Sequence, residues 1–432
     1  MKSREVKVAG LTIGGGTPIK IQTMCNTHTQ DVMPSVKQCV EMAAAGAELI
    51  RLTTQGMKEV EALKEIKKIL RERGIETPLV ADVHFSSDVA IEVAKVADKV
   101  RINPGNFAKE HSVAQSQFAR FIEVCKEYNT AVRIGINHGS LGERIINLYG
   151  DTPLGMMKAA MEWIEMCIDN DFYNVVVSLK ASNTIVMSTA YRLLWKAMQE
   201  RGVVFPVHLG VTEAGNGDTG RIKSAVGIAA LLKEGIGDTI RVSLTENPVN
   251  ELPVARIIAD YFYSGEYAKE KITQRHYDCA NWDEFIIKAS CDFGPLLLDK
   301  EIDDFTVTAT CAGEPVSAEA IEEFKDNLQQ AARRKFTKPE YIACPGCGRT
   351  LYNLEETFNE VKRRTSHLKG VRIAIMGCIV NGPGEMADAD FGYVGEGKGK
   401  VCIYKGKEPV LRSVPQEEAI DALLKIIEEN MQ

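Results

Sequence analysis

The chain has 432 residues, of which 45% are hydrophobic and 26% charged, so it is too long for one small core and suits a large domain with a smaller second one. Its formal charge of −7 disfavours a nucleic-acid-binding protein, because such proteins present a broad basic surface to phosphates. The first residues lack the apolar run of a signal peptide, and no stretch reaches the ~20 apolar residues of a membrane helix. We therefore expect a soluble, cytoplasmic protein.

From residue 19 to about residue 263, short β-branched runs alternate with longer amphipathic segments, as in a parallel sheet with helical crossovers. The runs lie at residues 19–24, 48–53, 78–83, 99–103, 131–137, 174–180, 204–211 and 238–245. Eight such units predict an α/β fold, a closed (β/α)8 TIM barrel of about 250 residues, with an open doubly wound sheet as the alternative. The preceding segment VKVAGLTIGGG is predicted to form a hairpin that plugs the N-terminal face of the barrel.

Polar and mostly basic residues end these runs, where barrel enzymes place their chemistry. In chain order they are Asn26, Arg51, Asp82, His84, Arg101, Asn103, Arg133, Asn137, Ser178, Lys180, His208, Arg241 and Ser243. Lys223 is predicted to belong to the same group. It lies at the start of the helix predicted after a Gly-rich loop, where free backbone N–H groups attract anions. One such Arg is ordinarily part of a surface ion pair, but several in an acidic protein predict a bound anion. We expect a phosphorylated ligand, since the planar Arg fork suits diphosphate oxygens.

The repeat stops near residue 264, which divides the chain into a barrel at 1–263, a linker or small inserted subdomain at 264–338, and a compact α/β unit at 339–432. The last unit is predicted to contain a strand, a helix, a second strand, a Gly/Pro loop, a hairpin and a final helix. The chain has 11 cysteines, an odd number that argues against a disulfide scaffold. Those in apolar helical patterns or without metal-ligand spacing are interpreted as packing residues: Cys39, Cys125, Cys167, Cys279, Cys291 and Cys311.

Two motifs in the last unit bring thiols and a carboxylate into Gly- and Pro-rich turns. Cys344 and Cys347 form a CxxC pair after one predicted strand, and Cys378 and Glu385 follow the next. Iron–sulfur clusters are usually held by four Cys thiolates, so three thiolates and one carboxylate indicate a cluster with one weakly held iron. Spacing alone leaves two alternatives open, which are a structural zinc site with Cys402 as the fourth thiolate and a redox dithiol.

Taken together, the ordered motifs resemble those of the hydroxymethylbutenyl diphosphate synthase family. They are VADVHF, RINPGNF, RIGINHGSL, SLKASN, HLGVTEAG, GDTIRVSLTENP, CPGCGR and GCIVNGPGEMADADFGYVG, and only about residues 265–335 lie outside the resemblance. The resemblance implies a barrel similar to dihydropteroate synthase and a cluster domain similar to that of sulfite and nitrite reductases. It also implies a [4Fe–4S] cluster whose ligands would be Cys344, Cys347, Cys378 and Glu385.

The implied reaction is the reductive ring opening and dehydration of 2-C-methyl-D-erythritol 2,4-cyclodiphosphate to (E)-4-hydroxy-3-methylbut-2-enyl diphosphate, in the methylerythritol phosphate route to isoprenoids. Two electrons would come from ferredoxin or flavodoxin. Glu251 is the candidate proton donor, Glu385 would yield its iron to substrate, and His84 would orient substrate or relay a proton. The expected substrate contacts are Arg51, Arg101, Asn103, Arg133, Asn137, Lys180, His208, Lys223, Arg241, Ser243 and Asn381.

Two questions stay open on the sequence. A non-redox barrel transferase similar to dihydropteroate synthase, with a structural metal module, would share the anion-binding mouth, whereas an iron–sulfur carrier would not need one. The motifs MADADFGYVG and TIVMSTAYRLL resemble the long plant-type form of the family, yet only roughly seventy residues separate the barrel from the cluster unit. In the short form the cluster domain closes the barrel of the other subunit of a homodimer, and in the long form closure within one chain is proposed.

Overall fold

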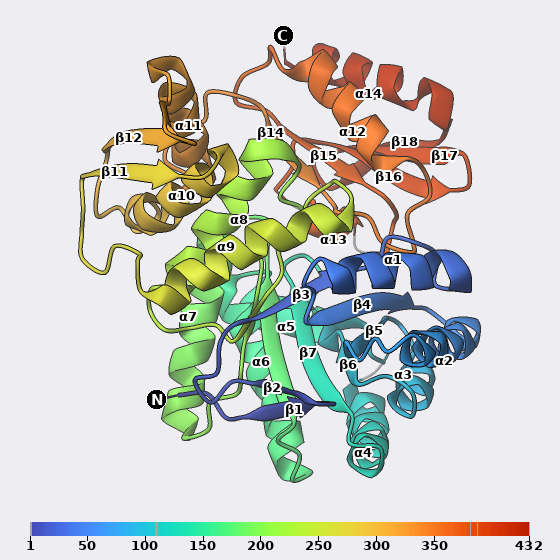
Figure 1. Ribbon diagram of the computed structural model, residues 1–432. Coiled ribbons are helices and arrows are strands. Elements are labelled where there is room, and N and C mark those ends of the chain that lie inside the picture. The colour runs from blue at the N-terminus through green and yellow to red at the C-terminus, as the bar shows by residue number, and fades with distance from the viewer. Residues whose placement is uncertain (1, 109–110, 381, 387, 432) are drawn as a thin grey trace.

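In the computed structural model, residues 2–108, 111–380, 382–386 and 388–431 are described. The chain forms a barrel, a small α/β layer on its flank and a C-terminal α/β unit above its mouth (Figure 1). No helix in these ranges is long and apolar enough to cross a membrane.

The barrel contains the eight expected strands in one parallel sheet. They are β3 (Lys20–Met24), β4 (Leu49–Thr54), β5 (Leu79–Val83), β6 (Lys99–Ile102), β7 (Ala131–Asn137), β8 (Val175–Lys180), β9 (His208–Leu209) and β10 (Thr239–Ile240). They are hydrogen-bonded in the order β8-β7-β6-β5-β4-β3-β10-β9, and a parallel bridge between Val177 and Val207 joins the two ends. The closed-barrel prediction is therefore confirmed. The strand β9 is shorter than its apolar run because Pro206 cannot donate a ladder hydrogen bond.

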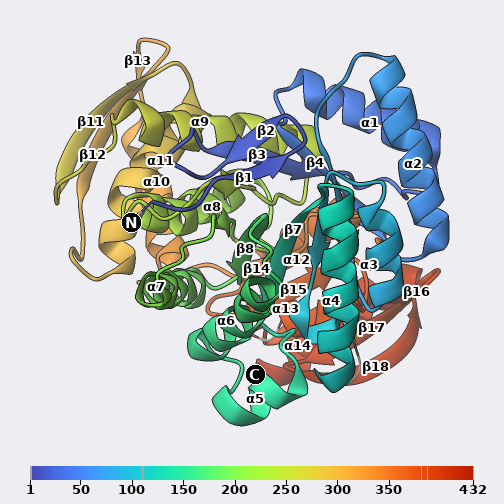
Figure 2. The ribbon, with the colours of Figure 1, turned by 90° about the horizontal axis from the view of Figure 1, so that it is seen from below.

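Helices surround the sheet, so that the strands are buried on both faces (Figure 2). They are α1 (Val32–Ala44), α2 (Met57–Glu72), α3 (Ser87–Ala94), α4 (His111–Glu127), α5 (Glu143–Tyr149), α6 (Pro153–Asp169), α7 (Thr184–Arg201), α8 (Gly217–Leu232) and α9 (Glu251–Ser264), with 3-10 turns at Pro104–Asn106 and Pro248–Asn250. Local capping fixes several starts directly after the strand ends: Asn183, for example, accepts hydrogen bonds from the backbone N–H groups of Ile185 and Val186.

An antiparallel hairpin closes the N-terminal face of the barrel. It consists of β1 (Val6–Val8) and β2 (Leu11–Ile13), and it crosses the barrel in the view from below (Figure 2). Val6, Val8 and Ile13 pack on Leu49 and Val80 near the starts of β4 and β5. The predicted plug is therefore confirmed, and a site can form only at the opposite end of the barrel, where the strands end.

The middle segment forms a layer against the barrel. It comprises β11 (Gln274–Cys279), α10 (Trp282–Leu298), β12 (Thr306–Cys311), β13 (Glu314–Pro315) and α11 (Ala318–Ala331), with its strands in the order β11-β12-β13. Phe285, Phe293 and Phe324 belong to the same hydrophobic core as the barrel side chains. The helix α8 is apolar on nearly every face, because it is enclosed between the barrel and this layer.

The C-terminal unit is a five-stranded sheet with helices. It contains β14 (Glu340–Ala343), α12 (Leu354–Thr365), β15 (Arg372–Met376), α13 (Gly382–Glu385), β16 (Phe391–Gly397), β17 (Lys400–Lys405), β18 (Glu408–Pro415) and α14 (Gln416–Asn430). The sheet order is β14-β15-β16-β17-β18, with the first three strands parallel. The strand β18 was not predicted from the sequence. It is an exposed edge strand with Pro near both ends, and edge strands tolerate Pro at such positions.

The C-terminal unit covers the mouth of the barrel of its own chain (Figure 1). Ala214, beyond β9, forms a parallel bridge with Ala343, and Thr245 Oγ1 donates to the carbonyls of Ala343 and Cys344 at 3.2 and 3.1 Å. Gly139 and Gly384 approach so closely that a Cβ on Gly139 would lie 1.9 Å from the Gly384 carbonyl oxygen. The space above the strand ends is therefore enclosed by two units of one chain.

Candidate active site

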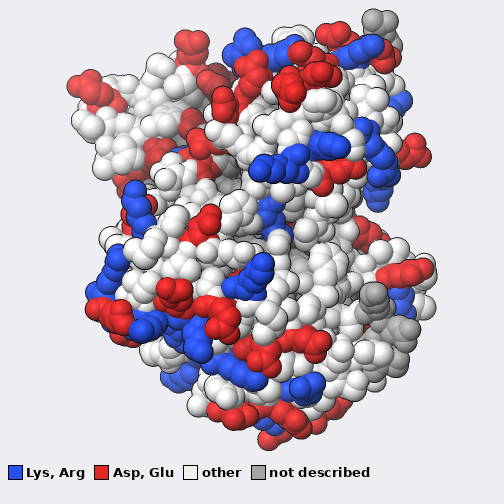
Figure 3. Space-filling model, turned by 90° about the vertical axis from the view of Figure 1, so that its right-hand side faces the viewer, with Lys and Arg blue, Asp and Glu red and all other residues white. Residues whose placement is uncertain are grey.

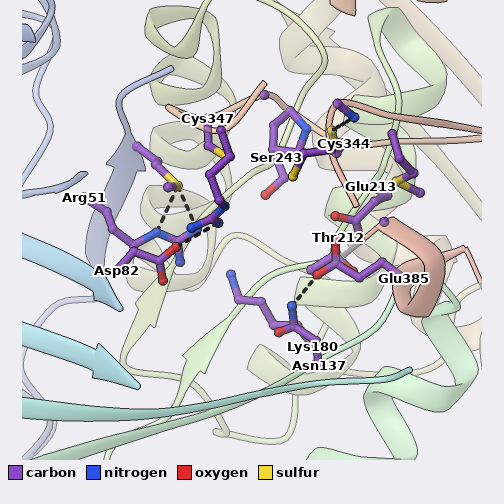
Figure 4. Close-up of a pocket in the computed structure, with 18 of the residues that line it drawn as sticks. Arg51, Asp82, Asn137, Lys180, Thr212, Glu213, Ser243, Cys344, Cys347 and Glu385 are labelled. Atoms are coloured by element: carbon purple, nitrogen blue, oxygen red, sulfur yellow. Dashed lines mark hydrogen bonds and ion pairs between the residues drawn. The ribbon is translucent and has the colours of Figure 1, made fainter. Parts of the chain in front are cut away.

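A cavity with about 710 Å³ of space between its atoms lies where the barrel mouth meets the C-terminal unit (Figure 4). The barrel contributes Met24, Arg51, Asp82, Arg101, Arg133, Asn137, Lys180, Thr212, Glu213, Arg241 and Ser243. The C-terminal unit contributes Cys344, Pro345, Gly346, Cys347, Arg349, Met376, Gly377, Cys378, Gly382 and Glu385.

Strand register brings the charged residues of the barrel to one level. Asp82, Arg101 and Arg133 are paired neighbours on β5, β6 and β7, so their side chains enter the barrel together. Arg101 Nη1 donates to Asp82 at 3.1 Å, and Arg349 from the C-terminal unit donates to the other Asp82 oxygen at 3.3 Å. Burial raises the pKa of Asp82, but Arg51 and Arg101 outweigh it and hold this pKa well below its usual range.

The positive charge of Arg133 is less well compensated by nearby carboxylates and hydrogen-bond acceptors than the charges of its neighbours. Its side chain is buried, and among the described residues its Nε and Nη1 atoms have no hydrogen-bond partner. Burial, followed by repulsion from Arg51 and Arg101, lowers its pKa well below the usual value. Burial and the charge of Arg133 lower the pKa of Lys180 in the same way. An anion placed between these cations would restore the balance.

Glu251, the predicted proton donor, lies behind Arg241. Its carboxylate accepts hydrogen bonds from Arg241 Nε and Nη2 at 3.2 and 3.1 Å, from Thr23 Oγ1 at 3.0 Å and from the Leu244 N–H at 3.2 Å. Only 1% of Glu251 is exposed, and the cavity wall at this point is made by Arg241 and Ser243. Glu251 therefore holds the Arg241 fork in place behind the cavity wall, and its role as a proton donor stays a prediction.

A different carboxyl group, Glu213, faces the cavity beside Glu385 (Figure 4). Burial raises the pKa of Glu213 well above its usual value, and the nearby charge of Glu385 raises it further. The carboxyl groups of Glu213 and Glu385 interact, Asn137 donates to Glu385, and Glu213 Oε2 has no hydrogen-bond partner among the described residues. Burial and the neighbouring charge both favour the protonated, neutral form of Glu213.

Two cavity residues, Glu213 and Arg349, were not predicted from the sequence. Glu213 follows the predicted strand 204–211 by two positions and has a φ of +50°, an uncommon backbone conformation for a residue with a side chain. Arg349 lies two positions after the CxxC pair. The signals available in the sequence were an acidic residue just beyond a strand end, Glu213, and a positively charged residue just beyond a cysteine pair, Arg349.

The three cysteines of the motifs lie on loops that face the same cavity. Cys344 and Cys347 follow β14 and Cys378 follows β15, and the Gly377 N–H donates to Cys344 Sγ at 3.2 Å. Burial and then the charge of Cys347 raise the pKa of the Cys378 thiol. In the described ranges, no three His, Cys, Asp or Glu side chains lie close enough to share one metal ion.

Cys402 is not part of this group. It is 1% exposed in β17 and packs with Ile342, Ala374 and Met376 on one face of the C-terminal sheet. A structural zinc ion would need four ligands at about 2.0–2.3 Å, and the four thiols of the zinc alternative are not assembled in this way. Three separated thiols and Glu385 around one space fit a polynuclear cluster better, because each iron of such a cluster takes its own protein ligand.

The remaining predicted residues have mixed placements. His84 Nε2 lies 2.5 Å from Arg101 Nη1, and burial followed by the charge of Arg101 lowers the pKa of His84 to about 3. Three predicted contacts lie away from the cavity wall: Asn103 donates to Ser140, His208 Nδ1 bonds Thr239 Oγ1, and Lys223 Nζ bonds Glu340 at 3.0 Å. Asn381 lies outside the described residues. Seven predicted contacts do meet at the cavity: Arg51, Arg101, Arg133, Asn137, Lys180, Arg241 and Ser243.

Comparisons with known proteins confirm the resemblance read from the motifs. The chain belongs to the GcpE family: the GcpE TIM-barrel domain matches residues 3–256, and the GcpE protein C-terminal domain matches residues 340–429. A Synechococcus sp. (strain CC9902) protein named 4-hydroxy-3-methylbut-2-en-1-yl diphosphate synthase (ferredoxin) is 42% identical over 446 residues, covering 99% of this chain and 94% of that protein.

A Phocaeicola vulgatus protein named 4-hydroxy-3-methylbut-2-en-1-yl diphosphate synthase (flavodoxin) is 36% identical, covering 99% of this chain and 98% of that protein. That alignment runs over 602 residues, so the relative has insertions that this chain of 432 residues lacks. Among solved structures, dihydropteroate synthase from Vibrio fischeri ES114 matches with a TM-score of 0.40 and 14% identity, covering 60% of this chain and 99% of that one.

Proposed function

We propose that this chain, as a member of that family, is an oxidoreductase that converts 2-C-methyl-D-erythritol 2,4-cyclodiphosphate to (E)-4-hydroxy-3-methylbut-2-enyl diphosphate. The observation that carries the proposal is one cavity in which uncompensated buried cations face three cysteines. The cations suit a diphosphate, and the cysteines suit an electron-transferring cluster. A non-redox transferase would use the cations alone and leave the three cysteine positions without a purpose.

The barrel residues would bind and orient the diphosphate. Arg51, Arg101, Arg133 and Arg241 can donate paired hydrogen bonds to its oxygens, and Lys180 can add a mobile positive charge. Within the described part of the chain, the free Nε and Nη1 atoms of Arg133 are available donors for such an anion. This arrangement would hold the carbon–oxygen bond of the ring toward the cysteine loops.

We further propose that Cys344, Cys347, Cys378 and Glu385 would hold a [4Fe–4S] cluster. When bound, the cluster would supply electrons one at a time and a Lewis-acidic iron. The carboxylate is the hardest of the four donors and the most readily exchanged for a substrate oxygen. Asn137, which donates to Glu385, would keep that carboxylate positioned.

Glu213 would supply a proton to the departing oxygen. The overall conversion takes up two electrons and two protons and releases one water, so an acid is needed where the carbon–oxygen bond breaks. Burial and the charge of Glu385 raise the pKa of Glu213, which favours its protonated form, and the contact with Glu385 would place that proton beside the proposed cluster position. Because the C-terminal unit covers the cavity, bulk water would not compete for this role.

The electron donor would be a one-electron carrier, ferredoxin or flavodoxin, as the names of the relatives state for those proteins. We propose that the chain works with it in the cytoplasm. Both halves of the cavity come from one chain, which supports closure within a monomer over closure between the subunits of a homodimer.

Reconstitution under anaerobic conditions tests the function. The expected result is a brown protein with about four irons and four sulfides that reduces the cyclic diphosphate when given a strong reductant. Colourless protein with one zinc, or an intact cluster without turnover, would contradict the proposal.

A paired substitution tests the proton donor. Glu213→Gln keeps the size and polarity of the side chain but has no acidic proton to give, so the kcat should fall by about 10²–10⁴-fold with cluster content and KM retained. Glu251→Gln is the matched control, since it loosens Arg241 and should act mainly on KM. A larger loss of kcat in Glu251→Gln than in Glu213→Gln would return the proton-donor role to Glu251.

A further inference from the structure

A second opening reaches the cysteine loops from outside. An open groove is lined by residues 28–31 before α1, by Gln55 and Glu59 at the start of α2, and by the loop segments 348–351 and 378–380. Cys378 and Arg349 line both this groove and the cavity. At Cys378 and Arg349, the outer surface therefore approaches the proposed cluster position.

Apolar side chains are exposed around this opening. Ile379, directly after Cys378, is 50% exposed, and Leu351, from the other cysteine loop, is 37% exposed. Met57, at the start of α2, is 49% exposed. Exposed apolar side chains that gather at one place mark protein contacts, and small interfaces of transient redox complexes have such a centre within a polar rim.

A basic edge lies on the C-terminal unit at the same end of its sheet. Because β15 and β16 are parallel, the turn after β16 points to the side on which Cys378 follows β15. This turn and the adjoining end of β18 carry Lys398, Lys400 and Arg412, which are exposed and make no ion pair within the described ranges. On the side of the molecule in Figure 3, a hollow separates the two halves, and Lys and Arg side chains gather along its upper edge.

The barrel side of the groove is more acidic. It carries Asp31 and Glu59, and Glu59 is engaged by the Gly56 N–H and by Gln30. The whole chain has a formal charge of −7, so an acidic carrier would be repelled at long range unless a basic edge guided it. Lys398, Lys400 and Arg412, at the end of the sheet where Cys378 follows β15, would supply that guidance.

We propose that an acidic ferredoxin docks on this surface, with its cluster over Ile379 and Leu351 and its carboxylates toward Lys398, Lys400 and Arg412. The inference rests on the proposed function, since only a redox enzyme needs such a carrier. Ferredoxin is chosen over flavodoxin because the relative that aligns over 446 residues, close to the length of this chain, is the one named for ferredoxin. One electron would pass from the reduced ferredoxin to the cluster that Cys378 helps to hold. Each ferredoxin oxidised would thus reduce that cluster by one electron.

The test compares two double charge reversals on the reconstituted holoenzyme. Lys398→Glu with Lys400→Glu changes the proposed surface. Lys369→Glu with Lys407→Glu makes the same change in net charge at the opposite end of the same sheet, before β15 and between β17 and β18. Binding of oxidised ferredoxin is titrated at low and high salt, and turnover is measured with reduced ferredoxin and with dithionite-reduced methyl viologen.

We expect the first variant to bind ferredoxin roughly five- to tenfold more weakly at low salt, with the difference shrinking at high salt. The turnover of this variant with methyl viologen should equal that of the unmodified enzyme. The control variant should match the unmodified enzyme in every assay. Equal weakening in both variants, or equal loss with methyl viologen, would overturn the docking surface. Binding of flavodoxin but not ferredoxin would overturn the choice of carrier. Absence of methyl viologen turnover in the unmodified holoenzyme would instead refute the proposed function itself.

Discussion

Replacing Arg133 by Met should stabilise the anion-free protein while it weakens diphosphate binding. Arg133 is 1% exposed, and two of its guanidinium nitrogens lack a hydrogen-bond partner among the described residues. Its neighbours Arg51 and Arg101 repel it. Met has a similar length and fills the same space without a buried charge.

The size of the effect follows from these contacts. A buried donor without a partner costs about 1–3 kcal/mol, so Arg133→Met should raise the free energy of unfolding by about that amount in buffer without multivalent anions. Pyrophosphate at about 100 times its Kd should stabilise the unmodified protein by about 2.7 kcal/mol. It should stabilise Arg133→Met much less, because one of the donors that hold the anion is gone.

Urea denaturation with and without pyrophosphate, in chloride buffer, measures both quantities. Lys58→Met is the matched control, because Lys58 is an exposed cation on α2, outside the cavity, and its loss should change stability by less than about 0.5 kcal/mol. If Arg133→Met unfolds at lower urea than the unmodified protein without anions, or gains as much from pyrophosphate, then the uncompensated-cation argument is wrong.

Three other outcomes are expected. His84 has a pKa of about 3 in the folded protein, so between about pH 6.5 and pH 3 only the unfolded chain binds this proton. The free energy of unfolding should therefore fall by about 1.4 kcal/mol for each pH unit below 6.5. Denaturation curves measured over a pH series should show a shallower fall for His84→Gln. Cys402→Ser should leave iron content and turnover unchanged, whereas Cys378→Ser should lose much of the cluster, as iron and sulfide analysis would reveal. Mixing the Arg133→Met protein with the Cys378→Ser protein should restore no activity if the C-terminal unit closes the barrel of its own chain. Recovery of about a quarter or more of the unmodified rate would indicate closure between chains.

The barrel could be predicted from the sequence because its signal is local and repeated. Each strand is a short β-branched run followed by an amphipathic segment, and closure follows from counting eight of them. The converging cations could be predicted for the same reason, since parallel strands end at one edge and register then aligns Arg101 with Arg133. The exposed edge strand β18 carries no such alternation, and it was missed.

The roles of other residues depend on contacts that form only in the folded chain. Lys223 occupies the expected helix start, but Glu340 of the C-terminal unit accepts its hydrogen bond and keeps it away from the cavity. Glu251 follows the last strand as expected, but Arg241 engages its carboxylate. Glu213 has an ordinary position in sequence, and its pKa is raised only in the folded chain, by burial and then by the charge of Glu385 from another unit. Local patterns place a residue near a site, whereas its protonation and its partners depend on the tertiary structure.

The same long-range contacts determine how the cysteine loops come to lie above the barrel. Glu340, the first residue of β14, bonds Lys223 of the barrel helix α8 at 3.0 Å and Arg333 from the end of the middle layer at 2.5 Å. Burial raises the pKa of Glu340, but these two cations outweigh it and lower the pKa. All three units thus meet at one buried carboxylate, and removal of one partner from such a group costs about 3–5 kcal/mol. The strand that leads to Cys344 and Cys347 is fixed within the chain by this junction, so the middle layer contributes to the site without touching it.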